Sequence, residues 1–180
     1  SALLLGSALA SASQAPSCEG WDPNFASTAL APAPDGPVYA TAVYDDGSGP
    51  KLYIGGDFGR IGNTLCRSIA RWDGHEWSAV GAAWSPDGSG TGIAHEVHAL
   101  AVYDDGSGPA LFACGHFSTS QALGPTTAIA RWDGTSWSVP GGGVQGGPLA
   151  LVVHDDGSGP KLFVGGYLVL AGGQPVSGIA

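Results

Sequence analysis

Paired carboxylates are the residues of this sequence whose type and spacing most suggest chemistry. The segment Asp-Asp-Gly-Ser-Gly-Pro occurs three times in the 180 residues, at 45–50, 104–109 and 155–160. Carboxylate and carbonyl oxygens are the ligands that Ca²⁺ prefers, although the sequence lacks the EF-hand pattern. Aspartate in a hairpin turn more often caps backbone N–H groups, and we expect that structural role here. The candidate calcium ligands are Asp45, Asp46, Asp104, Asp105, Asp155 and Asp156.

Histidines are the second candidate for metal chemistry. His95 and His98 form a His-x-x-His pattern. Residues three apart on a strand point to opposite faces, so this pair does not readily share an ion. His116 and His154 stand where other repeats carry aspartate or tyrosine, which indicates variation within a repeat. No nucleophile elbow, phosphate loop, dinucleotide fingerprint or Cys-x-x-Cys pair is present, so we predict no catalytic site and no cofactor other than calcium.

A second block shows that the aspartate segments belong to a longer repeat. Ile-Ala-Arg-Trp-Asp-Gly occurs at 69–74 and 129–134, and its first two residues recur as Ile179-Ala180. The aspartate segments start 59 and then 51 residues apart. The unit is therefore about 50 residues long, with an insertion in the first copy.

Each unit is predicted to contain four short antiparallel strands. Runs of β-branched and aromatic residues are bounded by Gly, Pro or Asp, and the aspartate segment joins the first two strands as a hairpin. The expected strands of the first unit are 38–44, 51–56, 68–72 and 77–80. Their counterparts are 97–103, 110–115, 128–132 and 137–139 in the second unit, and 149–154 and 161–166 in the third.

Arginine and tryptophan recur together in the second block. Arg71 and Arg131 each precede a tryptophan that is followed by Asp73 or Asp133. We expect the guanidinium to stack on the indole and to pair with a neighbouring carboxylate. Exposed tryptophan and aspartate also form sugar sites, but repetition in successive units favours a scaffolding role over carbohydrate binding.

The composition supports an all-β fold and disfavours negatively charged partners. Glycine makes up 31 of the 180 residues and charged residues only 12%. So much glycine destabilises helices but suits tight turns. The formal net charge of −9 would repel nucleic acid and an anionic membrane surface.

Residues 1–15 have the character of a secretory signal. An apolar run from Ala2 to Ala10 is followed by small residues, and the Ala10-Ser11-Ala12 triplet fits a signal-peptidase site. The run is too short to span a bilayer, which takes about 20 residues. We therefore expect a secreted, extracellular or cell-surface protein without a membrane span.

Three cysteines fit an oxidising compartment, where a disulfide can form. Cys18 and Cys66 are the preferred pair because both lie in loop-like stretches, although the spacing alone leaves every pairing open. Cys114 replaces a glycine of the strand repeat, and we expect it to be a buried thiol.

An apolar strand that ends in Gly-Gly, followed by an aromatic residue and then by a tryptophan, resembles the kelch repeat. The resemblance covers about residues 37–180, with tryptophan where kelch repeats usually carry tyrosine. The aspartate hairpin resembles instead a repeat of large exported bacterial proteins. The longer period disfavours WD40, in spite of the Trp-Asp pairs. The residues that carry the resemblance are Gly55, Gly56, Trp72, Trp77, Cys114, Gly115, Trp132, Trp137, Gly165 and Gly166. We expect these glycines and tryptophans to be structural, together with Arg71 and Arg131.

The resemblance implies four-stranded antiparallel blades of a kelch-like β-propeller. Two and a half to three blades do not close a ring of four to eight, so we expect a fragment or an assembly. The expected divisions are a signal-like segment at 1–15, an extension at 16–36 that supplies a ring-closing strand, and blades at 37–95, 96–147 and 148–180.

The function that this architecture implies is a non-catalytic extracellular scaffold that binds proteins or associates with itself through blade edges. The alternative is a propeller domain of a secreted carbohydrate-active or oxidase enzyme whose catalytic residues lie outside these 180 residues.

Overall fold

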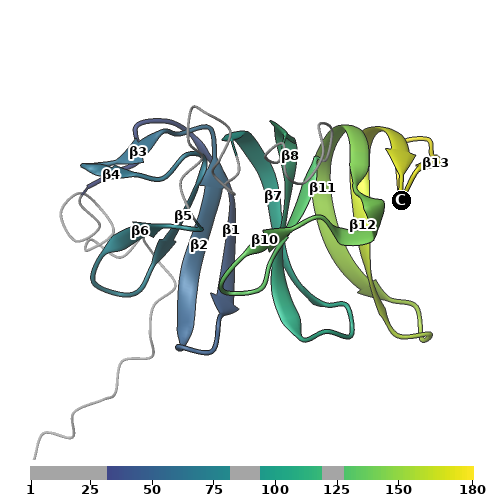
Figure 1. Cartoon of the computed structure of the whole chain (residues 1–180), viewed down its shortest axis with the longest axis horizontal. Coiled ribbons are helices and arrows are strands. Elements are labelled where there is room, and N and C mark those ends of the chain that lie inside the picture. The colour runs from purple at the N-terminus through teal and green to yellow at the C-terminus, as the bar shows by residue number, and fades with distance from the viewer. Residues whose placement is uncertain (1–31, 82–93, 119–127) are drawn as a thin grey trace, which may run out of the picture. The chain divides into compact units, whose positions relative to one another are not determined.

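The computed structural model describes residues 32–81, 94–118 and 128–180. These residues form an all-β fold, in which the only helical segment within the described ranges is a 3-10 turn, η1 (Pro140–Gly142). The strands form open antiparallel sheets that follow one another in chain order (Figure 1).

The first sheet has the strand order β1-β2-β5-β6. Its strands are β1 (Val38–Asp45), β2 (Pro50–Gly56), β5 (Ile69–Trp72) and β6 (Trp77–Ala79), and all neighbours are antiparallel. A small hairpin of β3 (Arg60–Ile61) and β4 (Thr64–Leu65) is inserted between β2 and β5. The four strands expected from the first unit are confirmed.

The second sheet repeats this order with β7 (Ala94–Asp104), β8 (Pro109–Ser118), β9 (Ile129–Trp132) and β10 (Trp137–Ser138). The third sheet contains β11 (Val144–Asp155), β12 (Pro160–Ala171) and β13 (Gln174–Pro175). An isolated bridge joins Gly165 to Ile179, in the same way that Gly55 pairs with Ile69 and Cys114 with Ile129. The three units therefore share one strand register.

The first strand of every unit contains a β-bulge at the same place. The pairing register shifts around Tyr39 in β1, His98 in β7 and Leu149 in β11, so each of these residues is an extra residue in its strand. Bulges redirect side chains and increase the local twist. The bulge therefore places three chemically different side chains at the same position of the repeat.

The bulge explains the second glycine of each pair. A Cβ on Gly56 would lie 2.1 Å from the Pro37 carbonyl oxygen, and one on Gly115 would lie 2.1 Å from that of Glu96. Gly166 repeats this close approach, with a positive φ of 148°. Glycine is thus required where the bulged strand crosses close to its partner.

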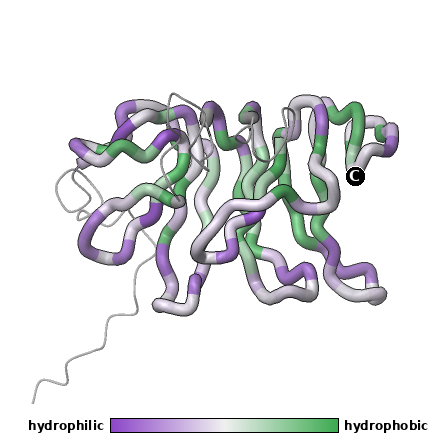
Figure 2. The backbone as a smooth tube through the Cα atoms, in the orientation of Figure 1, coloured by the Kyte–Doolittle hydropathy of each residue, from purple (hydrophilic) through white to green (hydrophobic). Residues whose placement is uncertain are grey.

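The core consists of apolar clusters that join neighbouring sheets. One cluster joins the first sheet to the second, and another joins the second to the third. A third packs the β3–β4 hairpin against the first sheet. Figure 2 shows the hydrophobic residues along the strands and the hydrophilic ones concentrated at turns.

Candidate functional site

The aspartate hairpins use their first carboxylate as a backbone cap. Asp45 accepts hydrogen bonds from the amides of Gly47 and Gly49, at 2.8 and 2.9 Å. Asp104 and Asp155 make the same pair of contacts in their own hairpins. The contacts of these carboxylates are the hairpin contacts expected from the sequence, and calcium binding stays a prediction.

The second aspartate of the first hairpin connects that hairpin to the rest of its sheet. Asp46 accepts hydrogen bonds from the Ser48 amide and hydroxyl, from Lys51 Nζ at 2.9 Å and from Arg71 at 3.0 Å. Burial alone would raise the pKa of Asp46, but the hydrogen bonds from Lys51 and Ser48 outweigh it and lower the pKa to about 2. Asp46 is therefore held ionised as a structural anchor.

The arginines pair with these hairpin carboxylates and not with the aspartates that follow the tryptophans. Arg131 Nε lies 3.0 Å from Asp105, which matches the contact between Arg71 and Asp46. Asp133 instead accepts the amides of its own turn, which lower its pKa, and Asp73 does the same. The expected pairing of each arginine with a carboxylate is therefore confirmed, but that carboxylate belongs to the hairpin, because the aspartate after the tryptophan is already satisfied by backbone donors.

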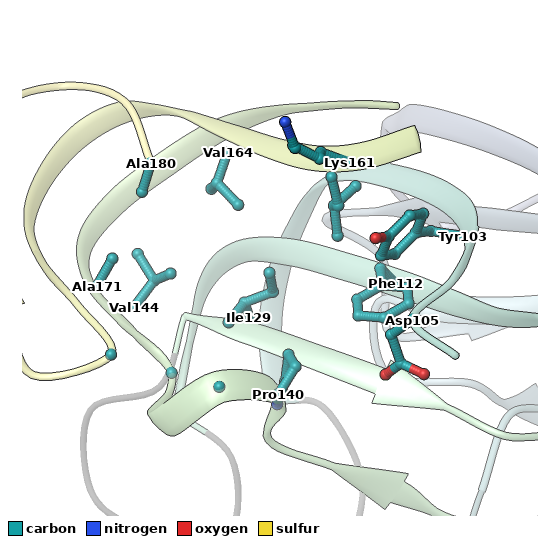
Figure 3. Close-up of a pocket in the computed structure, with 14 residues that line it drawn as sticks. Tyr103, Asp105, Phe112, Ile129, Pro140, Val144, Lys161, Val164, Ala171 and Ala180 are labelled. Atoms are coloured by element: carbon teal, nitrogen blue, oxygen red, sulfur yellow. The ribbon is translucent and has the colours of Figure 1, made fainter. Parts of the chain in front are cut away.

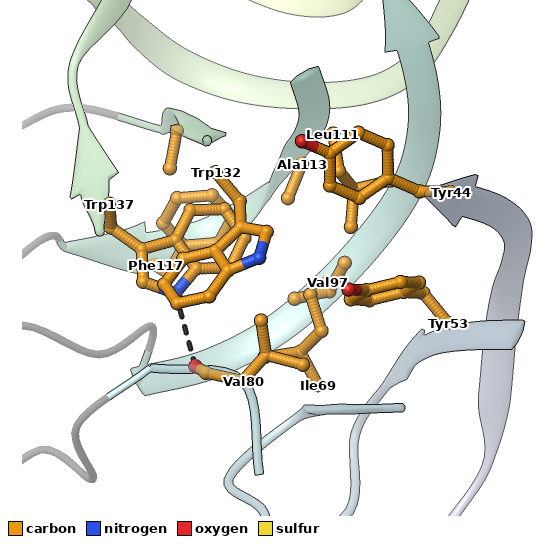
Figure 4. Packing of buried hydrophobic residues seen from close by; sticks show 11 residues of the cluster. Tyr44, Tyr53, Ile69, Val80, Val97, Leu111, Ala113, Phe117, Trp132 and Trp137 are labelled. Atoms are coloured by element: carbon orange, nitrogen blue, oxygen red, sulfur yellow. Dashed lines mark hydrogen bonds between the residues drawn. The ribbon is translucent and has the colours of Figure 1, made fainter. Parts of the chain in front are cut away.

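Two tryptophans of the second unit fill the space between the first and second sheets (Figure 4). Trp132 and Trp137 are only 3% and 5% exposed, and their rings lie 5.3 Å apart. Trp137 Nε1 donates a hydrogen bond of 3.1 Å to the Val80 carbonyl of the preceding unit. On the first sheet, the indoles share this cluster with Tyr44, Tyr53 and Ile69.

A cavity of about 400 Å³ lies between the second and third sheets (Figure 3). Its wall from the second sheet contains Tyr103, Phe112 and Ile129, which hold the repeat positions of Tyr44, Tyr53 and Ile69. Ala180, the counterpart of Ala130, lines its other side. The residues around this cavity therefore correspond to those that surround Trp132 and Trp137 at the interface between the first and second sheets.

The bulges line a second cavity, of about 290 Å³. Its walls are the three bulge residues Tyr39, His98 and Leu149, together with Glu96. The Tyr39 ring meets the His98 imidazole edge-on, with the ring centres 5.6 Å apart. Residues from all three units thus surround one cavity, although they are far apart in the sequence.

Glu96, His98 and His116 bring their polar atoms together beside this cavity. His98 Nε2 lies 3.0 Å from Glu96 Oε2, and His116 Nδ1 lies 3.5 Å from the same oxygen. The contact with His98, and after it the contact with His116, lowers the pKa of Glu96. Within the described residues, this is the only group of three or more side chains arranged to hold a metal ion.

Sequence reasoning missed this cluster. It compared His95 with His98 along the chain and attributed His116 to variation within the repeat. Glu96 and His116 are direct partners across β7 and β8, so the hairpin register was the signal that could have placed them together. The position of His98 depends on the bulge, which the sequence did not indicate.

The described cysteines are buried. Cys114 lies in β8 as a buried free thiol, as expected, and burial raises its pKa to about 12. Burial also raises the pKa of Cys66. Cys18 and the signal-like and ring-closing segments lie outside the described residues, so the Cys18–Cys66 pairing stays a prediction.

Comparison with known proteins gave no match to a family model, a curated protein or a solved structure. Across the described ranges, no helix has both the length and the hydrophobicity needed to cross a bilayer. The repeat geometry and the two cavities are therefore the basis for inference about function.

Proposed function

We propose that the three units are blades of a kelch-like β-propeller and that the protein is a secreted, non-catalytic scaffold. In this proposal, copies associate head to tail, with the first unit of one copy against the third unit of another. The observation that carries it is that the residues of each half of the internal tryptophan contact recur in a second unit, where Ile179 is 62% exposed and the Trp72–Trp77 pair is half-buried. The apolar run in residues 1–15 supports export.

The acceptor half of the contact lies on the third unit. At the internal interface it consists of the Tyr44–Tyr53 pair and Ile69, which is 1% exposed. The corresponding pair on the third unit is His154 and Phe163, with ring centres 6.4 Å apart. Ile179, the counterpart of Ile69, is 62% exposed. The third unit therefore repeats the acceptor positions, with His154 in place of Tyr44 and with an exposed isoleucine.

The donor half lies on the first unit. Trp72 and Trp77 stack at 5.4 Å and 47°, close to the 5.3 Å and 45° of Trp132 and Trp137. The first pair is only half-buried, whereas the second is buried against a neighbouring sheet. A second copy that placed its Trp72–Trp77 pair on the third unit would reproduce the internal contact. Such a head-to-tail contact generates a ring or an open filament.

The acidic character of the chain sets the conditions for association. A net charge of −9 makes copies repel one another, and added salt screens that repulsion. Association through apolar faces should therefore strengthen with ionic strength, whereas association through ion pairs would weaken.

Sedimentation velocity tests the proposal. We expect the average mass to increase with protein concentration from about 1 to 100 µM, and more steeply at 0.5 M than at 0.1 M salt. Ile179→Asp should weaken association by at least about tenfold, because it would bury an unpaired charge. Trp77→Ala should also weaken association, because it removes a donor residue of the contact.

Leu149→Asp is the matched control, because Leu149 is exposed but lines the bulge cavity and not the end face. Its association should equal that of the parent. A protein that stays monomeric at both salt concentrations, or that loses association equally in the Ile179 and Leu149 variants, would contradict head-to-tail assembly.

A further inference from the structure

The Glu96–His98–His116 cluster is held by the backbone and does not depend on the proposed scaffold role. Glu96 and His116 face each other across the β7–β8 ladder, and His98 is the bulge residue two positions further along β7. Residues two apart on a strand share a face, and the bulge adjusts the direction of the second side chain. Adjacent strands thus direct two imidazoles and one carboxylate to one point.

We propose that Glu96, His98 and His116 bind a divalent transition-metal ion, with Zn²⁺ as the best fit. Two imidazole nitrogens and a carboxylate oxygen are a ligand set that zinc accepts, with a water in the fourth position. At bond lengths of about 2.1 Å, tetrahedral ligand atoms lie about 3.4 Å apart. The carboxylate oxygen lies 3.0 and 3.5 Å from the two imidazole nitrogens, and all the ligand atoms lie within 4.8 Å of one another.

The surroundings leave room for an ion and for its water ligand. The neighbouring cavity of about 290 Å³ is lined by Glu96 and His98 themselves. Gly147 of β11 leaves room for the His116 ring, because any side chain at this position would place its Cβ only 2.8 Å from His116 Nε2. The edge-on contact with Tyr39 restricts the His98 ring. These neighbours come from the first and third units. The ion would therefore be bound by residues of the second sheet, in a space that all three sheets surround.

The ligand chemistry separates this site from the aspartate hairpins. Imidazole nitrogens favour zinc, copper, nickel and iron, whereas Ca²⁺ and Mg²⁺ require oxygen ligands. Selectivity for Zn²⁺ over Ca²⁺ therefore identifies the histidine cluster, and the reverse selectivity would identify the hairpins.

Isothermal titration of the full chain with ZnCl₂ at neutral pH tests the proposal. We expect one ion per chain and no binding of Ca²⁺ or Mg²⁺ at this site. His98→Ala, His116→Ala and Glu96→Gln should each weaken zinc binding by at least about tenfold. His95→Ala and His75→Ala are the matched controls, because neither residue belongs to the cluster, and both should bind zinc like the parent.

A second pair of variants separates loss of the site from loss of folding. Gly147→Ala should weaken zinc binding by displacing His116, whereas Gly165→Ala, with no atom within 4 Å of its added Cβ, should leave it unchanged. Co²⁺ should give the intense visible absorption of a tetrahedral site in the parent and lose it in His116→Ala. Equal zinc affinity in the parent and in all three ligand variants, or the absence of zinc binding by the parent, would overturn the proposal.

Discussion

Replacing Trp137 with alanine is expected to lower the free energy of unfolding by about 4 kcal/mol, the usual cost of removing a buried indole. The side chain is 5% exposed and donates a hydrogen bond to Val80 of the preceding unit. It also packs against Gly81, where an added Cβ would lie 2.9 Å from the indole. Urea denaturation followed by far-ultraviolet circular dichroism measures the loss.

Trp77→Ala is the matched comparison. Trp77 holds the same repeat position and stacks in the same way on Trp72, but it is only half-buried. Its replacement should cost about 2 kcal/mol, because less apolar surface is removed from the core. Equal losses for the two variants would mean that the contact between units contributes nothing beyond the packing within one unit, where Trp77 contacts the cluster of the β3–β4 hairpin.

Gly115→Ala is expected to cost about 3 kcal/mol, through a clash that the backbone must move to relieve. The added Cβ would lie 2.1 Å from the Glu96 carbonyl oxygen, and neither atom is at the end of a flexible side chain. The matched control is Gly165→Ala in the third unit, where nothing lies within 4 Å of the added Cβ. The control should change stability by less than about 1 kcal/mol. Similar melting temperatures for both variants would show that the bulge does not require its partner glycine.

The strands and hairpins could be predicted because their determinants are local. The aspartate segments supply both the turn residues and the caps, so β1 and β2 lie close to the ranges expected. The lengths of later strands were underestimated. Gly165-Gly166 was taken as the end of a strand, but β12 continues to Ala171 because the glycines accommodate a bulge in β11. Glycine in a strand can indicate either a turn or a close approach, and sequence alone does not separate the two.

The candidate site was less accessible to sequence reasoning because it depends on pairing between strands. Arg71 was expected to pair with a carboxylate near it in the chain, whereas its partner Asp46 lies in the hairpin between β1 and β2. His98 and His116 were judged separately, yet they meet because β7 and β8 are adjacent. In each case the missing information was the register between strands, which sets contacts across a sheet.

Extending the chain tests most directly whether the units pack by a repeated tryptophan contact. Ala180 holds the repeat position of Ala130, so the nine residues of 131–139 can be fused directly after it. If the two added indoles enter the cavity beside Tyr103 and Phe112, they should raise the melting temperature by about 5 °C. The same extension with both tryptophans changed to alanine should give no increase. Equal melting temperatures for the two extended proteins would contradict the account.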